Sequence, residues 1–314
     1  MSSPPVTPSS TVAPGAISTH RAVLLVTLGA ALWGVYWVPI RAIEHLGLAS
    51  AWSSTAVTLA AAPVGLLVAV WLRAPRLTGM QRCGAIFCGA ALTLYGFSLA
   101  NTDVVRAILL FYLSPIWSLL IETALFGRRW TTRTTLAVLA AALGMLLIFR
   151  GELPLDGLGA LGDWMAVGAG LAWSIGSAII FARGSVAASA LTATALAAAA
   201  VMSVLLSLAL AQSGTGVSTT PFSPDAQLWA LAATVVAAGV VYLTPVMLVT
   251  LWGTSQISPA TLGFILTAEI ISGVASSALF LGERFGLPEA AGTVLIIGGA
   301  VIEVMRKRDD PVTP

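Results

Sequence analysis

Ten stretches of about 20 mostly apolar residues follow one another along the chain, separated by charges, proline and glycine clusters or polar runs. A helix needs about 20 such residues to cross roughly 30 Å of hydrocarbon. Only 9% of the 314 residues are charged and 58% are hydrophobic, whereas about 25% of an ordinary soluble domain is charged. A soluble fold of this length cannot bury so much apolar surface, so we predict an all-α membrane protein.

The placement of basic residues tests this division, because loops on the cytoplasmic side carry an excess of Lys and Arg. The ten predicted spans are residues 22–43, 51–72, 83–100, 104–125, 134–150, 161–182, 187–211, 227–250, 257–280 and 286–305. With the N-terminus in the cytoplasm, eleven basic residues fall inside and three outside. The inside group is Arg21, Arg73, Arg76, Arg82, Arg128, Arg129, Arg133, Arg183, Arg306, Lys307 and Arg308, and the outside group is Arg41, Arg150 and Arg284. Both termini are therefore predicted to be cytoplasmic.

Two polar tails flank the predicted spans. Residues 1–20 are rich in Ser, Thr and Pro and contain neither Lys or Arg nor an apolar core, so we predict a disordered cytoplasmic tail and not a signal peptide. Residues 307–314 are predicted to form a second cytoplasmic tail. The net charge of only +2 gives a nucleic-acid partner no electrostatic footprint.

Residue types that carry catalysis or bind metals are scarce and scattered. Cys83 and Cys88 do not share a helix face and no His lies near them, so we interpret both as packing residues. The sequence has no Gly-rich phosphate loop, no His/Glu metal pattern and no nucleophile with a visible base. It therefore predicts no metal, no cofactor and no enzyme activity.

The chain also looks doubled, with residues 21–150 as one predicted unit and residues 151–306 as a second. The Ala-Leu-Trp-Gly sequence at residues 31–34 is echoed by Leu-Ala-Trp-Ser at 171–174, and Leu-Phe-Gly at 125–127 by Leu-Phe-Leu-Gly at 279–282. Five spans per half is an odd number, so the two halves must lie inverted in the membrane. Inverted repeats are a recurring architecture of secondary transporters, which bind substrate near the midplane between the halves.

Three motifs occur in a particular order: Leu-Trp-Gly at 32–34, Ser-Pro-Ile-Trp at 114–117 before Phe-Gly-Arg at 126–128, and Leu-Gly-Glu-Arg at 281–284. In these motifs the chain resembles EamA-type members of the drug/metabolite transporter superfamily, over residues 22–305. The resemblance implies ten transmembrane helices as two inverted five-helix repeats around a central cavity, with alternating access. The chain departs from the family pattern at Arg128, where many members carry Glu, and at Glu269-Ile270, where a proline is common.

Glu269 lies close to the centre of the predicted ninth span. A charge inside the membrane costs roughly 2.5–3.5 kcal/mol even on the lenient insertion scale, so such residues are rare and often functional. A carboxylate at this depth must face protein or a wet cavity, where it suits proton coupling or capture of a substrate ammonium. The alternative is a protonated Glu that hydrogen-bonds to a neighbouring helix.

Two further charges lie inside the predicted fourth span. Arg106 lies about one turn inside the outer end of this span. Three alternative roles are open to it there: it binds a substrate carboxylate, it extends to the interface, or it pairs with Asp103. Glu122 lies toward the cytoplasmic end, where a gate or a salt bridge is the alternative to a substrate contact. We keep Arg106 and Glu122 as candidate binding residues.

Aromatic side chains at membrane depth are candidates for the wall of a cavity. They are Trp33 and Trp37 in the first span, Tyr95 in the third, Tyr112 in the fourth, Trp173 in the sixth and Tyr242 in the eighth. A cavity lined by aromatic residues with a few fixed polar groups is a general small-molecule site, and packing is the alternative role for each residue. Ser114, from the family segment at 114–117, completes the candidate set.

The sequence thus predicts a secondary active transporter of a small polar metabolite, and the resemblance implies an amino acid or related compound and export. Without a nucleotide-binding motif, uphill transport must draw on a gradient, and a proton or cation is the candidate coupling partner. The alternatives are a membrane-embedded enzyme or lipid flippase, and a channel or structural membrane subunit. We expect a multi-pass protein of the bacterial inner membrane, in contact with lipid, as a monomer or homodimer.

Overall fold

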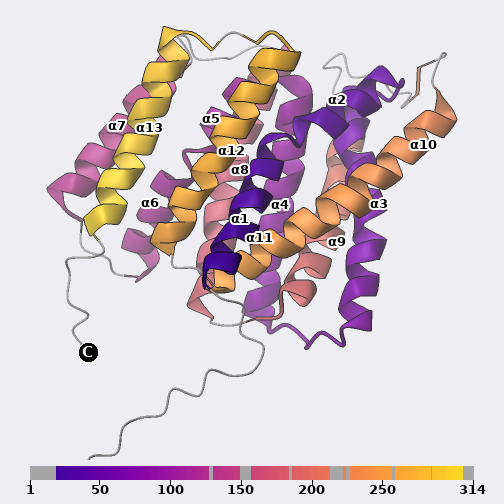
Figure 1. Cartoon of the computed structure of the whole chain (residues 1–314), viewed down its shortest axis with the longest axis horizontal. Helices are drawn as coiled ribbons and strands as arrows, with labels where there is room; N and C mark the ends of the chain where they lie inside the picture. The colour runs from indigo at the N-terminus through magenta and orange to yellow at the C-terminus, as the bar shows by residue number, and fades with distance from the viewer. Residues whose placement is uncertain are drawn as a thin grey trace, which may run out of the picture.

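The computed structural model describes residues 19–126, 130–148, 157–183, 186–212, 222–223, 227–256, 259–283 and 285–306. In these residues the chain folds into helices that run side by side between two ends of the molecule (Figure 1). This part of the chain contains no β-strand, only one isolated bridge between Leu48 and Phe222. The prediction of an all-α fold is therefore confirmed. The predicted tails, 1–20 and 307–314, and Arg128 lie outside the described residues, apart from the start of the first helix at Thr19.

The helices occupy the same parts of the sequence as the predicted spans. They are α1 (Thr19–Gly34), α2 (Trp37–His45), α3 (Ser50–Trp71), α4 (Gly79–Asn101), α5 (Val104–Phe111), α6 (Ser114–Phe126), α7 (Thr132–Ile148), α8 (Gly157–Ala182), α9 (Ala188–Gln212), α10 (Leu228–Val236), the π-helix η1 (Ala237–Leu243), α11 (Thr244–Gln256), α12 (Pro259–Phe280) and α13 (Leu287–Arg306). Three predicted spans are each divided between consecutive elements, namely α1 with α2, α5 with α6, and α10 with η1 and α11.

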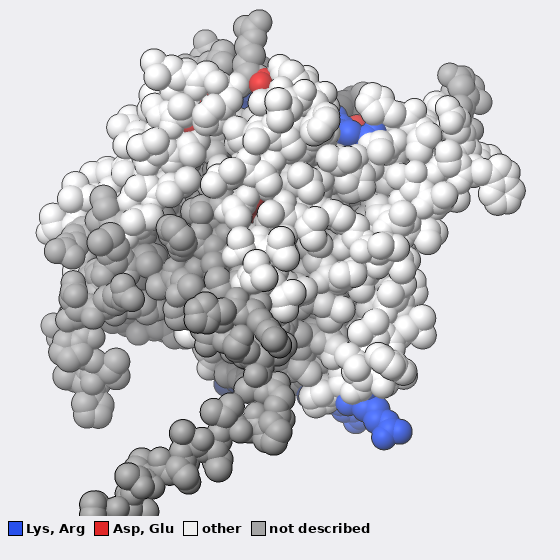
Figure 2. Space-filling model, in the orientation of Figure 1, with Lys and Arg blue, Asp and Glu red and all other residues white. Residues whose placement is uncertain are grey.

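Length and hydropathy of the described residues identify six segments that are able to cross a membrane. These are Leu24–His45, Ser50–Trp71, Gly79–Asn101, Ala160–Ala182, Ala188–Gln212 and Leu228–Gly253, while Val104–Ser118, Thr134–Ile148, Ala268–Phe280 and Leu287–Gly299 are shorter apolar segments. On the face drawn in Figure 2, charged side chains show mainly at the upper and lower edges, with a largely uncharged band between them. The chain is a multi-pass membrane protein.

Three interruptions of the long segments are each followed by a proline in the first turn of the next helix. The break between α1 and α2 precedes Pro39, the break between α5 and α6 precedes Pro115, and η1 precedes Pro245. Proline lacks an N–H and its ring clashes with the carbonyl four residues earlier, so the helix loses its regular hydrogen bonds in the preceding turn. Pro63, by contrast, lies inside α3 without a break in the helix.

Small and hydroxylated residues let neighbouring helices approach closely. A Cβ atom placed on Gly176 of α8 would lie 2.7 Å from the Gly84 carbonyl oxygen of α4. Helices α3 and α9 are joined by a hydrogen bond between Thr55 Oγ1 and Ser207 Oγ, 2.7 Å apart. Close approach of backbones and interhelical hydrogen bonds of this kind replace the hydrophobic driving force that helices lack inside a lipid bilayer.

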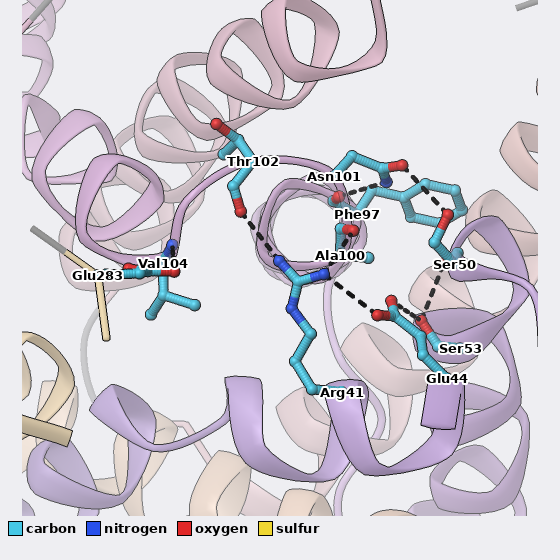
Figure 3. Close-up of polar contacts among 10 residues, drawn as sticks. All are labelled: Arg41, Glu44, Ser50, Ser53, Phe97, Ala100, Asn101, Thr102, Val104 and Glu283. Carbon is cyan, nitrogen blue, oxygen red and sulfur yellow. Dashed lines mark hydrogen bonds and ion pairs between the residues drawn. The ribbon is translucent and has the colours of Figure 1, made fainter. Parts of the chain in front are cut away.

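A short turn joins α4 to α5, and Arg41 of α2 holds one side of it (Figure 3). Its Nη1 donates to the Ala100 carbonyl at 3.3 Å and its Nη2 donates to the Thr102 carbonyl at 3.2 Å. A cation is favourable beside the carbonyl groups at a helix C-terminus. Arg41 Nη1 also lies 3.2 Å from Glu44 Oε2 within α2. The hydrogen bonds to the two carbonyls fix α2 against the end of α4.

Glu283, which follows α12, holds the other side of this turn (Figure 3). Its two carboxylate oxygens accept hydrogen bonds from the Val104 N–H at 2.9 Å and the Val105 N–H at 3.0 Å. The first N–H groups of a helix have no partner within the helix, and the Asp103 side chain at the N-cap position makes no capping hydrogen bond. The glutamate of the Leu-Gly-Glu-Arg motif therefore caps α5 and ties the end of α12 to it.

Candidate functional site

Glu269 lies in α12 with only 4% of its surface exposed. The Tyr95 hydroxyl, from α4, donates to Glu269 Oε1 at 2.9 Å. The Tyr112 hydroxyl, from the turn between α5 and α6, donates to Glu269 Oε2 at 3.1 Å. Three parts of the chain that are far apart in sequence thus meet at one buried carboxyl group.

The position of Glu269 depends on a close crossing of α1 and α12. A Cβ atom placed on Gly34 would lie 2.1 Å from Ser272 Oγ and 2.3 Å from the Glu269 carbonyl oxygen, so only glycine fits there. Ser272 Oγ also donates to the Ala31 carbonyl at 2.8 Å. The glycine of the Leu-Trp-Gly motif therefore has a physical role, because it lets the backbone of α12 lie directly on α1 beside Glu269.

Glu269 lines a pocket between α1, α4, α5, α8, α11 and α12. The pocket and the open space in front of it together contain about 450 Å³ that protein atoms do not fill. Its described lining residues are Trp33, Cys88, Ala91, Leu92, Tyr95, Phe111, Trp173, Met247, Thr250 and Glu269. A mostly apolar and aromatic wall with few polar groups is typical of small-molecule sites.

Hydrogen bonds and ring contacts fix the aromatic part of this wall. Trp33 Nε1 donates to Thr250 Oγ1 at 2.8 Å, and Thr250 Oγ1 donates in turn to the Val246 carbonyl at 2.8 Å. The ring centroids of Trp33 and Tyr95 lie 6.5 Å apart, and those of Tyr95 and Phe111 lie 4.9 Å apart. The side chains that surround Glu269 are therefore held in place before any ligand binds.

Four of the predicted site residues, Trp33, Tyr95, Trp173 and Glu269, line the pocket together. Tyr112 is not among the lining residues, although it donates to Glu269. It thus supports the carboxyl group from outside the cavity.

Three other predicted residues hold helices together near the pocket instead of lining it. Trp37 Nε1 donates to Ser276 Oγ at 3.0 Å. The Tyr242 hydroxyl donates to the Leu32 carbonyl. Ser114 contributes its backbone carbonyl, which accepts a hydrogen bond from Ser174 Oγ at 2.7 Å.

Arg106 lies away from the pocket lining and forms an ion pair with Asp163 of α8. Its Nε donates to Asp163 Oδ1 at 3.3 Å and its Nη2 donates to Asp163 Oδ2. Asp163 also accepts from Thr102 Oγ1 at 2.7 Å, and its side chain is only 2% exposed. The acidic partner of Arg106 is therefore Asp163 and not the neighbouring Asp103. The side chain of Glu122, in α6, lies outside the described residues.

Several residues of the pocket wall were not predicted from the sequence. Phe111 and Met247 are apolar residues in apolar helices, so nothing in the sequence distinguishes them from packing residues. Thr250 is a lone hydroxyl in such a run, and its role follows only from the Trp33 hydrogen bond across the pocket. Cys88, interpreted as a packing residue, is buried and lies on the same wall.

The first part of the chain, which contributes one side of this pocket, matches a known family. Residues 20–150 match the EamA-like transporter family, which is part of the drug/metabolite transporter superfamily. The resemblance inferred from the sequence motifs is therefore confirmed. Members of the EamA family are transporters and not enzymes, so the family supports a membrane transporter of the drug/metabolite type. No curated protein matches the sequence.

The fold of this chain also occurs among solved structures. A crystal structure described only as that of a protein superposes with a TM-score of 0.58, over 93% of this chain and 99% of its own. The two sequences are only 18% identical, so the likeness concerns the fold alone. The family that residues 20–150 match implies a small-molecule substrate and a lipid environment.

Proposed function

We propose that this EamA-like protein is a secondary active transporter that exports a small polar metabolite in exchange for protons, by alternating access. The observation that carries the proposal is the Glu269 carboxyl group, which is buried in a pocket and held by two tyrosine hydroxyls. An ionisable group inside the membrane is costly and marks an ion or substrate pathway in many carriers. Export is the direction that the family resemblance implies.

The proposed architecture has ten membrane-spanning segments in two inverted halves, residues 21–150 and 151–306, around the pocket. Trp33 and Trp173 support it, because they occupy the echoed sequences of the two halves and line the same cavity. In inverted-repeat transporters the substrate site lies between the halves. Alternating access then consists of a movement of one half against the other, which opens the pocket first to one side and then to the other.

The proposed orientation places both termini in the cytoplasm of a bacterium, with the protein in the inner membrane. The excess of Arg and Lys in the loops assigned to that side supports it, as does Figure 1, where the first residues of α1 and the last residues of α13 lie toward the same end. Reporter fusions at the C-terminus and within residues 213–226 should give opposite signals. Matching signals would contradict the ten-span topology.

In the proposed cycle, a proton and the substrate occupy the Glu269 carboxyl group in alternation. The inward-facing pocket takes up substrate as the proton leaves, and the outward-facing pocket takes up a proton as the substrate leaves. Tyr95 and Tyr112 keep the carboxyl group oriented in both steps, since each hydroxyl occupies one oxygen and leaves another lone pair for a ligand. The proton gradient thereby drives export without a nucleotide.

Reconstitution into proteoliposomes tests this proposal. With an acidic lumen, the wild-type protein should accumulate a transported compound from a panel of radiolabelled amino acids, nucleobases and quaternary ammonium ions. Glu269→Gln keeps the shape of the protonated side chain but cannot ionise, so it should fold and lose at least nine-tenths of this accumulation. Glu44→Gln removes a carboxylate outside the pocket and should retain it. Full, gradient-dependent accumulation by Glu269→Gln would refute the proposed role of this residue.

A further inference from the structure

We infer that the pocket selects organic ammonium ions with an apolar body, and that a zwitterionic amino acid fits it poorly. This inference rests on the proposed function and deepens it, because it names the chemical class of the substrate. Four observations carry it: the sign of the charge on the wall, the aromatic side chains around that charge, the hydrogen-bond donors that are already in use, and the acceptor positions that remain.

The charge on the described wall has one sign. Glu269 contributes a carboxyl group, and the described lining residues include no Lys, Arg or His. Arg106 is the basic residue that the sequence offered for a substrate carboxylate, but its guanidinium pairs with the buried Asp163 and it does not line the pocket. A cation that enters this pocket meets an opposite charge, whereas a carboxylate meets a like charge.

Aromatic side chains form much of the wall beside Glu269. They belong to Trp33, Tyr95, Phe111 and Trp173 and come from four different helices. Aromatic rings attract organic cations electrostatically, and sites for quaternary ammonium ligands are often built as aromatic cages. The same rings provide an apolar surface for the hydrocarbon part of a ligand.

Two hydrogen-bond donors of the wall are already used within the protein. The Trp33 N–H donates to Thr250 Oγ1 at 2.8 Å, and the Tyr95 hydroxyl donates to Glu269 Oε1 at 2.9 Å. A substrate carboxylate beside Trp33 or Tyr95 must take these donors from their partners or lose the hydrogen bonds it makes in water, and a buried charge without partners is strongly unfavourable. This cost discriminates against a zwitterion that shares the same apolar body.

The Glu269 carboxylate keeps acceptor positions for a ligand. Its two oxygens offer about four lone-pair sites, and the hydroxyls of Tyr95 and Tyr112 each occupy one oxygen. The N–H groups of a substrate ammonium can bind the remaining sites. The two tyrosines therefore hold the carboxylate in place without blocking it.

In this geometry the ammonium ion and a proton compete for the Glu269 carboxylate. The affinity for the ammonium ion should therefore fall as the medium is acidified. The titratable groups that face Glu269 in the described residues are Tyr95 and Tyr112, with Cys88 on the same wall and Tyr242 beyond it. The described side chains of α1 and α11 include no titratable group, Arg106 of α5 pairs with Asp163, and Glu289 of α13 accepts from the Gly286 N–H. Glu269 is thus the group in the pocket that exchanges the proton.

Three probes with one phenyl body test the inference on the purified full-length protein by calorimetric titration. Phenethylamine is a cation, phenylalanine adds a carboxylate to it, and 2-phenylethanol replaces the ammonium group by a neutral hydroxyl. Phenethylamine should bind at least tenfold more tightly than either of the other two compounds, and acidification should weaken phenethylamine binding. Phenylalanine or 2-phenylethanol binding as tightly as phenethylamine, or no phenethylamine binding to the folded wild-type protein, would overturn the inference.

Matched variants assign the effect to the pocket. Glu269→Gln should lower the affinity for phenethylamine at least tenfold, whereas the affinity of Glu44→Gln should stay within twofold of that of the wild type. Trp173→Leu should weaken phenethylamine several-fold and Trp173→Phe should restore most of the affinity, which separates an aromatic contact from simple packing. Unchanged binding by a folded Glu269→Gln variant would overturn the inference.

The two proposals fail in different ways. If proton-driven accumulation depends on Glu269 but phenethylamine binding does not, the substrate class is wrong and the coupling role stands. If phenethylamine binds at Glu269 but a proton gradient drives no accumulation of any compound in the panel, the pocket chemistry stands and the coupling role is wrong.

Discussion

Gly34 of α1 lies directly against the backbone of Glu269 in α12, where a Cβ atom on Gly34 would lie 2.3 Å from the Glu269 carbonyl oxygen. The carboxyl group that we place at the centre of transport is thus positioned by a residue with no side chain, in a different helix. The crossing also contains Gly273, where a Cβ atom would lie 3.0 Å from the Gly34 carbonyl oxygen. The position of Glu269 therefore depends on the contact between α1 and α12.

Gly34→Ala should therefore push α12 away from α1 and misplace Glu269. Overpacking of this kind costs about 1–3 kcal/mol, so the midpoint of thermal unfolding in detergent should fall and transport should be lost at temperatures where the variant is still folded. Gly298→Ala, in α13, is the control, because a Cβ atom there meets nothing within 4 Å. A fully active and stable Gly34→Ala variant would contradict the close crossing.

The hydroxyls of Tyr95 and Tyr112 both hold Glu269. Removing them one at a time should show which tyrosine only supports the carboxyl group and which also contacts the substrate. Tyr112→Phe removes a hydrogen bond to the carboxylate from outside the pocket, and Tyr95→Phe removes one from its wall. Both variants weaken the ionised form, so the pH profile of transport should move to higher pH in each. Only Tyr95→Phe should also change substrate affinity by more than about threefold. Equal effects of the two variants on affinity would contradict this division of roles.

Part of this arrangement could be predicted from the sequence, and the physical reason is clear in each case. Apolar runs of membrane-spanning length predicted the helices, and the cost of an intramembrane charge singled out Glu269. The partners of the charges could not be predicted, because they come from tertiary contacts: the sequence offered Asp103 for Arg106, but the fold brings Asp163 to it. Thr250 and Phe111 were missed because a single hydroxyl or phenyl side chain in an apolar helix does not differ in sequence from a packing residue.

Loss of the Glu283 carboxylate should destabilise the protein without altering the pocket. Glu283→Ala leaves the Val104 and Val105 N–H groups of α5 without their partner, and loss of a helix cap costs about 1 kcal/mol. Asp103→Ala is the matched control, since the Asp103 side chain makes no capping hydrogen bond. Thermal unfolding of the two variants should show the larger loss for Glu283→Ala, and the reverse order would contradict the capping role.

Breaking the ion pair between Arg106 and Asp163 should also affect stability more than binding. Asp163→Asn removes the charge that the Arg106 guanidinium faces, and we expect a loss of about 2 kcal/mol, below the 3–5 kcal/mol of a fully buried pair, because the Arg106 side chain is 27% exposed. Ligand affinity should stay within twofold of the wild type in Asp163→Asn and in Arg106→Lys. A loss of ligand affinity in a stable Arg106→Lys variant would indicate that Arg106 contacts the substrate.

Proton movement driven by substrate is the critical test of proton exchange at Glu269. Proteoliposomes with a pH-sensitive dye in the lumen receive a saturating amount of trimethyl(2-phenylethyl)ammonium or another transported compound outside, with no gradient imposed. In wild-type vesicles the compound should enter as protons leave, so the lumenal pH should rise, whereas Glu269→Gln vesicles should show no change above protein-free vesicles. An equal rise in lumenal pH with the wild type and Glu269→Gln would contradict proton exchange at Glu269.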